Sequence, residues 1–207
     1  MRPAPLVAAL AAVAAPLAVL AGGGSLAVLD QKNGFRGAEL GAPRDRFEGL
    51  EPAGRRGRAH LFTRRGDKLS LFETRLASIV YGFEDERLAS IVVTGAWTLD
   101  PKLSLCEGNN DHIADNLRAA FGKPTATHAY SSAEGRRCLR EHAGGLADPY
   151  CRVLEWKSKR VRLSLFTLMT TAPGAPPPGV DRPAGWRGHS CRFVLEYARV
   201  VDPADEL

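Results

Sequence analysis

The sequence feature that most constrains the fold is a hexapeptide, Arg-Leu-Ala-Ser-Ile-Val, which occurs at residues 75–80 and again at 87–92. Apolar, aromatic and β-branched side chains recur at every second position through both copies, and the acidic tripeptide 84–86 lies between them. Alternation with a period of two is typical of β-strands, and such side chains fit a pleated, half-buried surface. Residues 75–95 therefore predict a β-hairpin with its turn at 84–86.

The first 21 residues contain the three parts of a secretory signal peptide in their usual order. Arg2 supplies a positive charge, an apolar run interrupted by Pro16 occupies residues 6–20, and small residues end at Ala21. The alternative is an uncleaved membrane anchor, but a spanning helix needs about 20 apolar residues and this run is shorter. We expect cleavage near Ala21 and a mature protein that is periplasmic or secreted, with no later transmembrane segment.

Composition indicates an ordinary globular domain. Of the 207 residues, 44% are hydrophobic and 25% are charged, and residues 22–207 fit the length of one domain. The net charge of +5 comes from 28 basic and 23 acidic residues that are interspersed. Because no extended field of one sign results, we expect no nucleic-acid partner.

Four cysteines fit an oxidising compartment, where an even number usually indicates disulfides. Three connectivities are possible. We predict that Cys138 pairs with Cys151, closing an irregular glycine-rich loop, and that Cys106 pairs with Cys191, tying the segment before a helix to the final strand. The alternative is a metal site at Cys138, His142 and Cys151, but its spacing matches no zinc pattern. We therefore expect neither a metal nor a cofactor.

The first half of the mature chain predicts one short helix and several strands. Residues 35–41 read as a short strand, and Pro43 suits the first turn of a helix over 43–50. Extended runs at 60–63 and 68–74 join the hairpin in an antiparallel meander. The basic loop at 54–58 is interpreted as a solvated turn, and its functional alternative is a contact for phosphate or lipid head groups.

The second half predicts a longer helix followed by three strands. Asn109 to Asp111 offer N-caps for a helix in which Ile113, Leu117 and Phe121 recur at helical spacing before Gly122. Residues 129–149 read as irregular, and strand-like runs follow at 150–156, 160–169 and 191–200. We expect an α+β fold: an antiparallel sheet of two helix-and-strand halves, with the helices packed on one face.

Several short patterns resemble those of a family of uncharacterised bacterial exported proteins. They are Phe35-Arg-Gly-x-x-Leu-Gly41, Tyr81-Gly-Phe83, Leu117-x-x-x-Phe121-Gly-x-Pro124 and Trp156 with its apolar strand pair. The layout is also loosely similar to envelope-assembly lipoproteins of the SmpA/OmlA type and to β-lactamase-inhibitor proteins. The resemblance implies a helix-plus-sheet fold and carries over no functional residue.

The sequence contains no motif that indicates catalysis. It has neither a Gly-x-Ser-x-Gly turn nor a phosphate-binding glycine loop. Its histidines are scattered along the chain, at His60, His112, His128, His142 and His189.

The remaining signal is a proline-rich loop at 171–189, which carries Trp186 and Arg187. Tryptophan and arginine often dominate the energetics of interfaces, and prolines reduce the entropy that a loop loses on binding. We expect a non-catalytic binding or inhibitory module of the bacterial cell envelope that contacts an unknown protein or envelope component through Trp186, Arg187 or the open sheet face. The alternative is a small secreted hydrolase whose site forms only in three dimensions.

Overall fold

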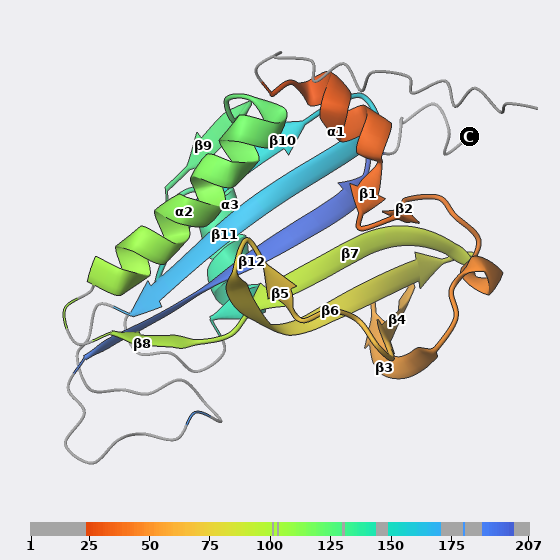
Figure 1. Ribbon diagram of the computed structural model, residues 1–207, viewed down its shortest axis with the longest axis horizontal. Coiled ribbons are helices and arrows are strands. Elements are labelled where there is room, and N and C mark those ends of the chain that lie inside the picture. The colour runs from red at the N-terminus through yellow and green to blue at the C-terminus, as the bar shows by residue number, and fades with distance from the viewer. Residues whose placement is uncertain are drawn as a thin grey trace, which may run out of the picture.

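A computed structural model describes residues 24–100, 102, 104–129, 131–143, 149–170, 180 and 188–200. Within these residues the protein is a mixed α/β fold in which an antiparallel sheet is combined with three α-helices (Figure 1). The elements are, in chain order, α1 (Leu26–Lys32), β1 (Gly34–Phe35), β2 (Ala38–Glu39), the 3-10 helix η1 (Arg44–Arg46), β3 (Leu50–Arg56), β4 (Ala59–Arg64), β5 (Ser70–Leu71), β6 (Thr74–Glu84), β7 (Arg87–Gly95), β8 (Thr98–Asp100), α2 (Ser104–Phe121), β9 (Ala126–His128), α3 (Ala133–His142), β10 (Pro149–Lys157), β11 (Val161–Thr170) and β12 (His189–Arg199).

The main sheet has the strand order β3-β4-β6-β7-β12-β11-β10-β9, with β5 added beside β6 and β8 beside β12. The predicted hairpin is confirmed as β6 and β7, and its turn residues Asp85 and Glu86 have φ values of 47° and 61°. Positive φ at both central residues is the geometry of a tight two-residue hairpin turn. Strands from before and after α2 meet where β7 pairs with β12.

The helices do not share one face of the sheet, so that expectation is wrong for α3. Leu154 and Leu165 pair on one face, and they belong to the large core that also contains Ile113 of α2. Val153 and Phe166 pair on the opposite face and form a second core with α3. The physical reason is that β10 and β11 are apolar at consecutive positions, and two apolar faces each need a cover.

Both predicted cysteine pairs are joined in the structure. Cys106 at the start of α2 is bonded to Cys191 of β12, with 5.6 Å between the Cα atoms. Cys138 of α3 is bonded to Cys151 of β10, with 6.4 Å between the Cα atoms. Each bond therefore fastens one helix to the sheet face that it covers.

Several elements differ from the sequence prediction. The helix expected to begin after Asn109 begins at Ser104, and the region 129–149, expected to be irregular, contains α3. Most residues of α3 are charged or polar, so few apolar residues mark it in the sequence. Its N-cap Ser132 accepts a hydrogen bond from the Gly135 amide at 3.0 Å. The helix expected over 43–50 is only η1, and Leu50 begins β3, a strand whose side chains are mostly exposed and give no apolar alternation in the sequence.

Some predicted features lie outside the described residues. These are the leader at 1–21 and most of the proline-rich loop, including Trp186 and Arg187. Among the described helices, none combines the length and apolar character needed to cross a membrane.

Candidate functional site

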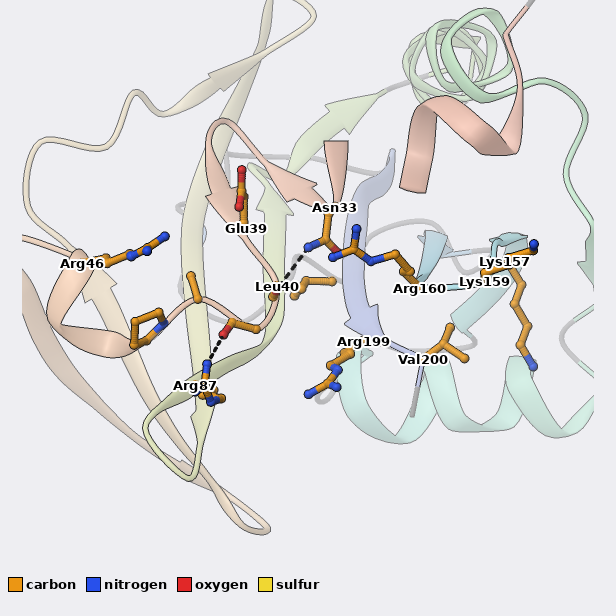
Figure 2. Close-up of a pocket in the computed structure, with 13 residues that line it drawn as sticks. Asn33, Glu39, Leu40, Arg46, Arg87, Lys157, Lys159, Arg160, Arg199 and Val200 are labelled. Carbon is orange, nitrogen blue, oxygen red and sulfur yellow. Dashed lines mark hydrogen bonds between the residues drawn. The ribbon is translucent and has the colours of Figure 1, made fainter. Parts of the chain in front are cut away.

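A cavity of about 950 Å³ opens between the 39–46 segment and the turn that joins β10 to β11 (Figure 2). We call it the basic cleft. Six of its lining residues are cationic and one is anionic. The lining consists of Asn33, Glu39, Leu40, Gly41, Ala42, Pro43, Arg46, Arg87, Lys157, Lys159, Arg160, Arg199 and Val200.

The first wall is a segment held against the start of β7. The Gly41 amide donates to the Leu88 carbonyl at 2.7 Å, and the Leu88 amide donates to the Ala42 carbonyl at 2.9 Å. The Arg87 guanidinium donates to the Gly41 carbonyl at 3.0 Å. These three bonds fix the backbone that leads to Arg46, which lies on this side of the cleft (Figure 2).

The second wall is the turn at 157–160, which α1 holds in place. Its backbone amide at Arg160 donates to Asp30 Oδ1 at 2.9 Å, and the Val161 amide donates to the Ser158 hydroxyl oxygen at 3.1 Å. Desolvation alone would raise the pKa of Asp30, but hydrogen bonds from Ser158, Arg160 and Lys159 outweigh it and the pKa is lowered. The carboxylate is thus ionised at neutral pH and anchors the turn.

Two further contacts hold the walls to neighbouring elements. Asn33, with a left-handed φ of 42°, ends α1, and its side-chain amide donates to the Leu40 carbonyl at 2.9 Å. The Val200 amide, just after β12, donates to the Arg160 carbonyl at 2.9 Å. The cleft is therefore built where α1, the 39–46 segment, β7, β12 and the β10–β11 turn come together.

Most of the cations in the cleft have no acidic partner. Within the part of the chain that the structure describes, no salt bridge involves Arg46, Lys157, Lys159, Arg160 or Arg199. Figure 2 shows the two lysines and Arg160 across the cleft from Arg46. Uncompensated charges of one sign in a concave surface attract ligands of the opposite sign. The basic cleft is therefore suited to anions.

Sequence reasoning did not identify this site. Residues 157–159 lie between the predicted strands at 150–156 and 160–169, and the cluster of basic residues from Lys157 to Arg162 is the local signal for a charged site there. The basic loop at 54–58 is the end of the β3–β4 hairpin, where Arg56 pairs with Glu196 at 3.3 Å. Trp186 and Arg187, the binding residues predicted from the sequence, lie outside the described residues.

The alternative metal site at Cys138, His142 and Cys151 is excluded by the disulfide, because bonded sulfurs offer no thiolate. His142 packs on Phe166 with 5.0 Å between ring centroids. Burial is the main cause that lowers the pKa of His142 to about 4, so its ring is neutral. Elsewhere in the described ranges, no three His, Cys, Asp or Glu side chains form a group that could hold a metal ion.

Comparisons with protein-family models, with curated proteins and with solved structures found no match to this chain.

Proposed function

We propose that the protein is a non-catalytic binding module of the bacterial cell envelope that holds an anionic ligand in the basic cleft. The observation that carries the proposal is the excess of cations in the cleft: six of its described lining residues are basic and one, Glu39, is acidic. The walls that carry these side chains are fixed by backbone hydrogen bonds before any ligand arrives. A preformed site loses less entropy on binding than a mobile one.

The envelope location is supported by two disulfides, which persist in oxidising compartments. We also propose that the sheet consists of two helix-and-strand halves, one ending at β7 and the other containing β9 to β12. In this interpretation the cleft lies at the junction of the halves, because Arg87 begins β7 and Arg199 ends β12. Clefts between units are frequent places for ligand sites.

Charge reversal on one wall tests this function. The variant Lys157→Glu with Lys159→Glu should lose most of its affinity for tripolyphosphate, a soluble polyanion, in isothermal titration calorimetry in 0.1 M salt. The matched control is Arg55→Glu with Arg58→Glu, which changes the net charge equally at the exposed β3–β4 hairpin, outside the cleft lining.

The control variant should bind almost as tightly as the wild type, since exposed charges beyond about 10 Å are screened in 0.1 M salt. Equal losses in both variants would show that only net charge attracts the anion. Absence of binding by the wild-type protein would refute the proposed function.

A further inference from the structure

We infer that the ligand of the basic cleft carries about three phosphate groups and bridges both walls of the cleft. The inference rests on the proposed function and specifies its ligand. Among the described residues that line the cleft, six cations and one carboxylate leave an excess of five positive charges. A phosphate monoester carries about −1.5 to −2 at neutral pH, so roughly three such groups would balance the cleft.

The distribution of the cations indicates a bridging ligand. Arg46 and Arg87 belong to the first wall, whereas Lys159 and Arg160 belong to the second, and Arg199 enters from the end of β12. The volume of about 950 Å³ equals that of roughly 30 water molecules in the liquid. A single phosphate fills only a small part of this space, so one small anion leaves most of the cations unsatisfied.

Exposure of the cations also favours several simultaneous contacts. Arg46, Arg87 and Lys159 are all exposed at the rim of the cleft, and one exposed ion pair contributes only about 0–1 kcal/mol. High affinity therefore requires a ligand that contacts many cations at once, because each further contact is then intramolecular. Lysine and arginine side chains are the usual partners of phosphate oxygens.

A second cavity indicates where the uncharged part of the ligand would lie. It has a volume of about 370 Å³ on the α3 side of the sheet, and Arg87 and Arg199 line both cavities. Small side chains at Ala89, Ser90 and Ala198 line part of it, and Arg56 and Glu196, which also line it, pair with each other at 3.3 Å. The carboxylates of Glu84 and Asp85 disfavour phosphate there.

Neither cavity lining contains an aromatic residue that could stack on a nucleobase. The chemistry therefore fits a multiply phosphorylated sugar or glycerol derivative, either free in solution or as a lipid head group.

The first experiment compares tripolyphosphate with inorganic phosphate by calorimetry on the intact protein. We expect one tripolyphosphate per chain, bound about 100-fold more tightly than phosphate, as expected for linked contacts. Either Arg46→Ala on the first wall or Lys159→Ala on the second should weaken tripolyphosphate binding about fivefold or more. The control Arg55→Ala should leave it unchanged, and circular dichroism should show the same fold in all variants.

Two results would overturn the inference while leaving the proposed function intact. One is inorganic phosphate binding as tightly as tripolyphosphate. The other is tripolyphosphate binding that depends on Lys159 but not on Arg46, because a ligand held by one wall does not bridge the cleft. Failure of every anion to bind would instead remove the proposed function itself.

A second experiment distinguishes the two sources of the phosphates. Vesicles of phosphatidylcholine containing phosphatidylinositol trisphosphate, a lipid with several phosphates on its head group, are sedimented with the wild-type protein and with Lys159→Ala. Sedimentation of the wild type that tripolyphosphate reverses and Lys159→Ala reduces assigns the ligand to a lipid head group. No sedimentation, together with tight tripolyphosphate binding, assigns it to a soluble phosphorylated molecule.

Discussion

The carboxylate of Asp30 in α1 accepts a hydrogen bond from the backbone amide of Arg160 at 2.9 Å, although 130 residues separate the two in the chain. This contact fixes the turn that carries Lys157 and Lys159 into the basic cleft. An acidic residue thus positions a cationic wall without lining the cleft itself.

Asp30→Ala is expected to reduce the affinity for tripolyphosphate by about two- to fivefold. Without its anchor the 157–160 turn becomes mobile, and ordering it when the ligand binds costs conformational entropy. Electrostatics alone predict the opposite sign, since the substitution removes a negative charge near the cations. Asp30→Asn is the matched control: it removes the charge but keeps an acceptor oxygen, so its affinity should equal or exceed that of the wild type. Calorimetry on the three proteins gives the order, and tighter binding by Asp30→Ala would contradict the positioning role.

The disulfides should differ in their effect on stability. Cys106 and Cys191 lie 85 residues apart, whereas Cys138 and Cys151 lie 13 apart. In the chain-entropy model, loops of these lengths correspond to about 4.5 and 3 kcal/mol. Replacing the first pair by alanine should therefore lower the free energy of unfolding more than replacing the second. Urea denaturation measures both, and a larger loss for the short loop would mean that the packing of α3 dominates.

Phe121 belongs to the main core at the end of α2, with only 5% of its surface exposed. Phe121→Ala should lower the free energy of unfolding by about 3–5 kcal/mol through lost burial and a residual cavity. Leu105→Ala is the control on the same helix, because Leu105 is 58% exposed and its replacement should cost less than about 0.5 kcal/mol. Similar urea midpoints for the two variants would contradict this orientation of α2.

His142 should make the protein less stable in acid. Its folded-state pKa is lowered by burial to about 4, below the unfolded value of about 6.5. Between these pH values the unfolded chain binds a proton that the folded protein rejects, so stability falls as the pH decreases through this window. The contribution lost is at most about 3 kcal/mol.

His142→Phe keeps an aromatic ring against Phe166 and removes the titrating group. Urea midpoints at the two ends of the window should therefore differ less for this variant than for the wild type. An equal pH dependence in both proteins would show that other groups cause the acid sensitivity.

Much of the sheet could be predicted from the sequence because its signals are local. Residues 75–95 alternate with a period of two, and β10, β11 and β12 contain apolar runs. Both patterns can be recognised without knowing which elements pack against these strands. Elements with few apolar residues, such as α3 and β3, were less predictable. β10 and β11 are apolar on both faces. A run without alternation does not indicate which of the two faces a given helix will cover.

The sequence by itself determined the hairpin and the second-half strands, since each follows from local spacing. The cysteine pairing was predicted as one of three possible connectivities, and the tertiary structure decided it. Only the tertiary structure decided the basic cleft. Arg46, Arg87, Lys159 and Arg199 come from four separate segments, and in the sequence each is an ordinary surface cation. They form one site because strand pairing and the Asp30 anchor bring these segments together. Electrostatic potential depends on distance in space and not on separation along the chain.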